Sequence, residues 1–293
     1  MISKFRIGAL VIILNFFASV AMIWGQDNPS LLQMAVPSLN IAPDARGGGM
    51  GDMGAATLPD INSQYWNAAK YAFMGSKAGV SLSYTPWLRK LVNDVALVNM
   101  TGYYKLGNSD LQAISASLRY FSLGEVNIWE NIGDVPYGLN PYEMAFDVAY
   151  SRKLSESYSM AVTLRYIRSD MGTDQNDESN AGNAFSADIS GYLEKYVLMG
   201  NAEALWSFGF NLSNIGSKIS YDGGNTNQYL PAKLTLGTGL LYPIDDYNQI
   251  GVYLDLNKYM VPYAPQKEEG ETDADYQTRV DDYKSWSSLS GML

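Results

Sequence analysis

The sequence predicts an all-β fold: an antiparallel transmembrane β-barrel of the outer membrane with an N-terminal plug. Three observations predict it. Period-two alternation recurs in about nine segments after residue 78, the N-terminus has the features of an export signal, and a glycine-rich segment without regular period lies between them. We therefore expect a signal peptide (1–25), a leader and plug (26–78) and a β-barrel (79–293).

The first 25 residues have the order of charge and hydrophobicity that is typical of a secretory signal. Lys4 and Arg6 form a basic start, an apolar run follows from Ile7 to Phe17, and small residues follow at Ser19 and Ala21. A membrane anchor helix is the alternative, but the apolar run is short for one. An exported protein is the better interpretation.

The segment from Pro37 to Phe73 is dense in glycine and small residues. It is either a disordered leader or a compact plug, and its aromatic residues favour the plug because disordered segments are poor in aromatics. Arg46 either meets carboxylates of the barrel wall or is solvated. The residues of the expected plug motif are Asp44, Arg46, Gly47, Gly49, Met50, Gly51, Tyr65, Trp66 and Asn67.

The expected strands alternate apolar residues with small or polar ones. Met144 to Ser151 and Trp206 to Ser213 are clear examples. A length of about 10 residues is what a tilted strand needs to cross a bilayer. The expected strands cover residues 80–85, 94–105, 111–121, 144–151, 160–166, 184–197, 206–213, 232–242 and 250–257.

Three features favour a membrane barrel over a soluble sandwich. The second face of the strands is small and polar, as a wet lumen would be, and aromatic residues gather near the strand ends. Short turns near residues 107–109, 155–157, 200–201 and 243–246 alternate with long connections at 122–141, 170–183, 214–230 and after 261. Short periplasmic turns with long external loops are typical of outer-membrane barrels, which predicts the plug on the periplasmic side and the long loops outside the cell.

The strand pattern also predicts the register of one pair of neighbouring strands. If Ser155–Glu156–Ser157 is a three-residue hairpin loop, Asp147 lies directly opposite Arg165 on the face that points away from lipid. We expect an ion pair between them. The alternative is that both side chains are solvated in a wide lumen.

The composition excludes several classes of function. The chain of 293 residues has no Cys and no His, which excludes disulfides, thiolate catalysis, Ser-His-Asp catalysis and His-ligated zinc. The net charge of -10 argues against nucleic acid as a partner. We expect no enzyme, no cofactor and no metal site.

The C-terminal part holds the most charged segment, residues 262–282, which is either a mobile acidic surface loop or a partner-binding loop. Residues 285–293 begin a helix or another strand. Nine strands do not close a bacterial barrel, since such barrels have an even number. We therefore expect a chain truncated at its C-terminus, lacking roughly 100 residues of a complete barrel.

The segment IAPDARGGGMGDMGAATLPDINSQYWNAAKYAF resembles the PorV/PorQ family of the type IX secretion system. The Pro43–Asp44–Ala45–Arg46 pattern with the following Gly-Met-Gly, and the Tyr-Trp-Asn-x-Ala pattern at 65–69, carry the resemblance. It covers nearly the whole chain. The wider superfamily, which includes the long-chain fatty-acid transporter, often has Asn-Pro-Ala where this chain has Asn67–Ala68–Ala69.

The resemblance implies a plugged barrel of fourteen strands. It implies a carrier that docks at a giant translocon barrel (SprA- or Sov-like), binds the C-terminal signal domains of secreted cargo, and passes the cargo to the cell-surface sortase PorU. Outer-membrane lipid would surround it.

Two other functions are open. A plugged channel for hydrophobic small molecules such as fatty acids would need a greasy lumen, and the predicted lumen face is polar. A lipid-modifying enzyme would mostly use His, which this chain lacks.

Overall fold

The computed structural model of the chain describes residues 32–87, 89–90, 94–107, 111–129, 135–173, 179–200, 202–222, 227–268, 270–288 and 290–292. The expected signal peptide lies outside these residues, as do the expected turn residues Asn108, Ser109 and Asn201.

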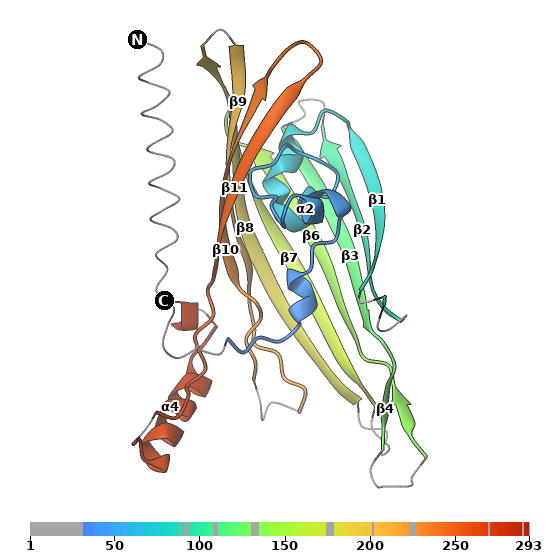
Figure 1. Cartoon of the computed structure of the whole chain (residues 1–293), viewed down its shortest axis with the longest axis vertical. Helices are drawn as coiled ribbons and strands as arrows, with labels where there is room; N and C mark the ends of the chain where they lie inside the picture. The colour runs from blue at the N-terminus through green and yellow to red at the C-terminus, as the bar shows by residue number, and fades with distance from the viewer. Residues whose placement is uncertain are drawn as a thin grey trace.

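Nine antiparallel strands form one sheet in which sequence neighbours are also spatial neighbours. Each expected strand overlaps one observed strand, so the all-β prediction is confirmed. The sheet is curled along its width, and β1 and β11 are its edges in the described part of the chain (Figure 1). The strands are β1 (Ala78–Pro86), β2 (Val95–Leu106), β3 (Gln112–Leu123), β6 (Tyr142–Lys153), β7 (Tyr158–Thr173), β8 (Ser179–Met199), β9 (Ala202–Gly216), β10 (Lys233–Pro243) and β11 (Gln249–Tyr259).

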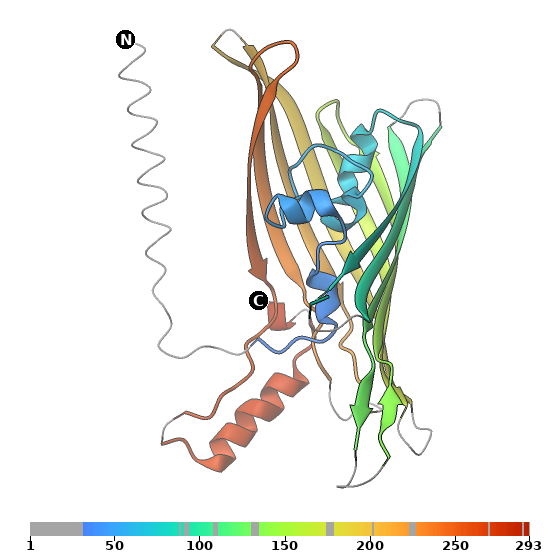
Figure 2. The same ribbon diagram turned by 45° about the vertical axis from the view of Figure 1, so that its right-hand side comes forward.

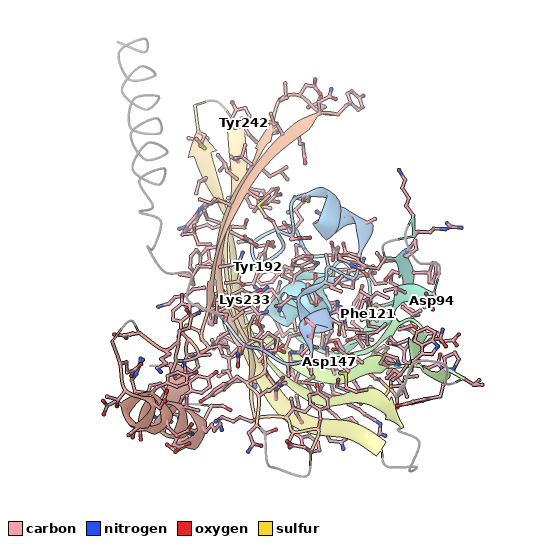
Figure 3. The ribbon with its side chains drawn as sticks, turned by 60° about the horizontal axis from the view of Figure 1, so that its bottom comes forward. Asp94, Phe121, Asp147, Tyr192, Lys233 and Tyr242 are labelled. Carbon is pink, nitrogen blue, oxygen red and sulfur yellow. The ribbon has the colours of Figure 1, made fainter. Side chains whose placement is uncertain are left out.

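The two faces of the sheet differ in chemistry. The convex face carries exposed apolar side chains such as Leu82, Leu164 and Val252, whereas small, polar and charged side chains are buried on the concave face. Figure 3 shows Phe121, Asp147, Tyr192 and Lys233 gathered toward the concave side. A face of exposed apolar residues around a polar interior is what a lipid-facing wall requires.

The two ends of the sheet also differ (Figure 1). Short turns join β2 to β3, β6 to β7, β8 to β9 and β10 to β11 at one end, which we call the short-turn end. Longer connections lie at the other, the long-loop end. There β4 (Val126–Ile128) and β5 (Tyr137–Leu139) pair as a separate small hairpin inside the expected loop 122–141.

Two expected connections are wrong in detail. β7 extends to Thr173 and β8 begins at Ser179, so both ends of the expected loop 170–183 are strand. The expected acidic loop contains helix α4 (Asp273–Ser285), whose first turn is capped by the Thr272 side chain accepting from the amide of Asp275 at 3.2 Å. A Thr at this position is a typical N-cap residue and indicates the start of a helix. The segment was nevertheless predicted as a loop because it is so highly charged.

The inner segment, residues 34–77, lies against the concave face (Figure 2). It contains η1 (Pro37–Asn40), α2 (Ala45–Gly49), α3 (Ser63–Trp66) and η2 (Ala68–Phe73). At the long-loop end the amide of Ala35 donates to the carbonyl of Tyr229 at 2.9 Å. At the short-turn end Lys105 Nζ donates to the carbonyl of Met74 at 2.8 Å. The segment therefore runs along the length of the interior before β1 begins.

Within the described ranges, no helix is both long enough and apolar enough to cross a membrane.

Candidate functional site

The plug motif is a small structural unit built around Trp66. Asp44 caps α2 by accepting from the amide of Gly47 at 2.7 Å, and its other oxygen accepts from Trp66 Nε1 at 2.8 Å. A Cβ at Gly47 would lie 2.3 Å from the indole ring, and a Cβ at Gly54 would lie equally close. Only glycine therefore lets the two chain turns close on the indole from both sides.

Arg46 pairs with Asp60, and its Nη1 lies 2.6 Å from Asp60 Oδ2. The expectation of a wall carboxylate is wrong, because Asp60 belongs to the inner segment itself. Gly49 has open space where a Cβ would stand. Met50 follows the last turn of α2, and Gly51 has a φ of +80°, a conformation that glycine adopts without strain.

Tyr65 and Asn67 join the plug motif to the nine-stranded sheet, which forms the wall around the inner segment. The Tyr65 ring packs edge-on against Trp66 at 4.7 Å and lies 4.8 Å from the guanidinium carbon of Arg119 on β3. Asn67 is fully buried, and its side-chain amide donates to the carbonyls of Ala55 and of Gly191 on β8, each at 2.9 Å. One side chain thus fixes a loop of the segment to a strand.

Lys70 is buried without a carboxylate in direct contact. Its Nζ donates to the carbonyl of Gly54 at 2.8 Å and to Thr57 Oγ1 at 3.1 Å. Burial lowers the pKa of Lys70 from 10.5 to about 8, although the charge of Asp60 opposes this fall. The cation stabilises the loop that carries Gly54 and Thr57.

Side chains of the wall bind the inner segment mainly at the backbone groups of the segment. Asp255 of β11 accepts from the amides of Gly54 and Ala55 at 2.9 and 3.0 Å, and Glu143 of β6 accepts from the amide of Ser38 at 3.0 Å. Wall hydroxyls and amides donate to segment carbonyls in further contacts: Ser83 to Pro43, Ser159 to Ala69, Ser207 to Ala56 and Asn211 to Trp66. These bonds satisfy backbone groups of the short helices and of the loops between them.

Two inward glycines let the segment approach the sheet closely. Gly209 of β9 and Gly237 of β10 lie opposite each other, with Asp255 as the next residue across. A Cβ at Gly209 would lie 1.9 Å from the carbonyl oxygen of Ala55. Glycine inside a strand often marks such an approach of another backbone.

Asp147 and Arg165 lie directly opposite each other in the β6–β7 register. Arg165 Nε is 2.6 Å from Asp147 Oδ1, and Arg165 Nη2 is 2.8 Å from Asp188 Oδ2. Arg165 also donates to Asn214, which a bulge in β9 turns toward the interior. The guanidinium is thus held between two carboxylates and an amide, and a buried charge requires partners of this kind.

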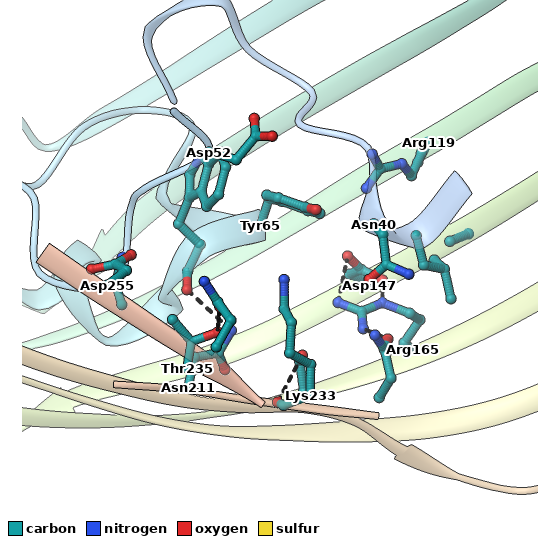
Figure 4. A pocket seen from close by; sticks show the side chains of 17 residues that line it. Asn40, Asp52, Tyr65, Arg119, Asp147, Arg165, Asn211, Lys233, Thr235 and Asp255 are labelled. Atoms are coloured by element: carbon teal, nitrogen blue, oxygen red, sulfur yellow. Dashed lines mark hydrogen bonds and ion pairs between the residues drawn. The ribbon is translucent and has the colours of Figure 1, made fainter. Parts of the chain in front are cut away.

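A polar cavity of about 30 Å³ lies between this cluster and the inner segment (Figure 4). Asp52 and Tyr65 line it from the segment, and Arg119, Lys233 and Asp255 line it from the wall. This volume is close to the share of one water molecule in the liquid. Buried atoms without a hydrogen-bond partner among the described residues border it: Asn40 Oδ1, Arg119 Nε, Asn211 Oδ1 and Asp255 Oδ1.

Sequence reasoning assigned no partner to Glu143, Asp188, Asn214 or Asp255, all on the wall. The inward-facing Gly209 and Gly237 indicate that another backbone packs closely on the sheet. The local sequence does not identify which segment that backbone belongs to. Within the part of the chain that the structure describes, no three metal-ligating side chains come together. The arrangement is suited to holding the segment against the sheet.

The family comparison gives the context for this architecture. Residues 25–267 match the family model described as "PorV: Type IX secretion system protein PorV". The chain belongs to the PorV family. It is therefore an outer-membrane component of the type IX secretion system and takes part in protein transport. No curated protein matches the chain.

Proposed function

We propose that the protein is a cargo carrier of the type IX system. It docks at the giant translocon barrel (SprA- or Sov-like), binds the C-terminal signal domain of cargo, and passes the cargo to the sortase PorU. The observation that carries the proposal is the filled interior. Because the inner segment is hydrogen-bonded along the concave face, the surfaces left for partners are on the outside of the molecule.

We propose further that residues 1–25 are a signal peptide, 26–78 a leader and plug, and 79–293 a barrel. The long-loop end faces the outside of the cell and the short-turn end faces the periplasm. The difference in connection length supports this orientation, since outer-membrane barrels have short periplasmic turns. In this orientation the predicted periplasmic side holds for the end of the plug that joins β1, while its N-terminal end lies near Tyr229 at the outer end.

The β4–β5 hairpin at the long-loop end is the best candidate for a partner contact. Val126, Trp129 and Val135 on or beside it are exposed apolar side chains. Trp is enriched where protein partners bind, and exposed apolar side chains at a loop end gain from being covered.

The alternative of a channel for fatty acids has less support. The cavity beside the plug is polar and holds about 30 Å³. Sites for small apolar ligands are usually about ten times larger and lined mostly by apolar side chains.

The test is affinity purification of the full-length protein from its native membrane, followed by mass spectrometry. We expect a very large barrel, a sortase and signal-domain cargo to copurify. Trp129→Ser should reduce their recovery, whereas Tyr247→Ser in the exposed turn after β10 is the matched control and should not. Recovery of this protein without any of these partners, and with bound fatty acid, would overturn the proposal in favour of the channel.

A further inference from the structure

The convex face has a dent in an otherwise bulky apolar surface. The dent holds about 490 Å³ and lies over β1, β2, β3 and β6. None of the described residues that line it is charged. It lies on the opposite side of the sheet from the plug and is unrelated to the polar cavity.

The strand register explains the dent. One outward row runs across the strands as Val80, Gly102, Ala116 and Val148. The next row toward the long-loop end is Leu82, Met100, Leu118 and Phe146. Two small residues side by side in the first row leave a hollow that is walled by large apolar side chains.

The backbone conformation at position 102 does not require glycine. Its φ is not positive, and a Cβ there would meet its nearest atoms at 3.3 Å and 3.5 Å, which is tight but not prohibitive. Glycine weakens a strand interior, so its presence on an outward position points to something that approaches closely from outside. Small residues serve the same purpose where elements pack inside membranes.

The rim at the short-turn end is polar and cationic. Tyr104 and Ile114 form the row beyond Gly102 and Ala116, and Lys77 Nζ lies 5.8 Å from the centre of the Tyr104 ring. Arg152 is exposed on β6, four residues from Val148, which is about 13 Å along a strand. An apolar hollow with a cation at that distance matches an acyl chain attached to a phosphate headgroup.

We propose that this dent, over Gly102 and Ala116, is a binding site for one glycerophospholipid. An acyl chain fills the hollow, and the phosphate lies near Lys77 and Arg152 in the leaflet that the short turns face. The site depends on placement in the outer membrane and not on the carrier role.

The test uses the full-length protein in nanodiscs of phosphatidylglycerol, with native mass spectrometry of lipid that remains after transfer to detergent. Ala116→Leu fills the dent and should lower the retained phosphatidylglycerol about fivefold, the size of a modest packing contact in lipid. Ala187→Leu is the matched control, because Ala187 is an outward small residue of the same row, opposite Leu164 and outside the dent. It should leave retention unchanged.

A second variant tests the headgroup. Arg152→Gln should reduce retention of phosphatidylglycerol but not of a diacylglycerol with the same chains. Equal phosphatidylglycerol retention by the wild type and Ala116→Leu would overturn the site. So would a loss of copurifying proteins on Ala116→Leu with lipid retention unchanged, since the dent would then be a protein contact.

Discussion

Two arginines in different regions of the molecule each have two carboxylate partners. Arg165 lies between Asp147 and Asp188 inside the curled sheet, where its side chain is 6% exposed. Arg279 of α4 lies between Glu268 and Glu271, where its side chain is 40% exposed. The shorter contact is 2.6 Å for both arginines, and the second is 2.8 Å for Arg165 and 3.4 Å for Arg279. The larger difference between the two sites is their exposure to solvent.

The comparison extends to the regions around them. The helices of the inner segment have four to six residues, and wall side chains pair with backbone groups of Ser38, Trp66 and Ala69 in three of them. α4 has 13 residues and buries none of them. Its cap and ion pairs are local. The interior is held by contacts between residues far apart in the sequence. The cap and ion pairs of α4 join residues within about a dozen positions, whereas Tyr283 and Lys284 at its end contact Tyr229 and Lys218 of the connection before β10.

The largest effect is expected from Arg165→Met. Removing the guanidinium leaves Asp147 and Asp188 buried without their cation, and breaking a buried pair in this way costs about 3–5 kcal/mol. Urea unfolding of the protein in lipid vesicles measures the loss. A change below about 1 kcal/mol would mean that water reaches the cluster and that the interior resembles the surface.

The second prediction concerns Lys70, which lies in the inner segment and outside the strands. Its pKa falls from 10.5 in the unfolded chain to about 8 in the folded one, chiefly through burial. Between these values the unfolded state binds more protons, so stability rises with pH through this window. The full gain is about 3 kcal/mol, and Lys70→Met should flatten the profile.

Unfolding measured from pH 7 to pH 10 tests this directly. A wild-type stability that stays level or falls across the window, with the Lys70→Met profile parallel to it, would contradict a buried lysine. Asp60 and Asp255 favour the charged form and Arg46 opposes it, so Asp60→Asn should lower the pKa of Lys70 further.

The third prediction tests how closely the segment packs on the sheet. In Gly209→Ala the new Cβ would lie 1.9 Å from the carbonyl oxygen of Ala55, so the loop must move away from β9 at a cost of about 1–3 kcal/mol. Hydrogen exchange at the amides of Gly54 and Ala55, which bond to Asp255, should become faster. Gly49→Ala has open space around it and is the matched control. Unchanged exchange in Gly209→Ala would show that the loop does not rest on Gly209.

These sites differ in how far the sequence predicts them. Period-two alternation predicted all nine strands, and one three-residue turn was enough to place Asp147 opposite Arg165. The second carboxylate, Asp188, and the bulge that turns Asn214 inward could not be predicted, because they depend on the register of β8 and β9 rather than on any local pattern. For Arg46 the sequence left a wall carboxylate and a solvated side chain as alternatives, while its partner Asp60 is 14 residues away in the same segment.

The smallest effect is expected from Arg279→Met, the surface counterpart of Arg165→Met. Its partners Glu268 and Glu271 stay hydrated when it is removed, so the sheet should unfold at the same urea concentration as in the wild type. The change should be confined to α4 and the turn before it.

Hydrogen bonding to Arg279 lowers the pKa of Glu271, so this contact is complete above the usual carboxyl range and is lost as the pH falls through the lowered value. Backbone chemical shifts of residues 271–285 should therefore change on acidification in the wild type and change less in Arg279→Met. If the variant instead unfolds the sheet at a lower urea concentration, the Arg279 pairs stabilise the interior as well as α4, and the contrast between the two arginines fails.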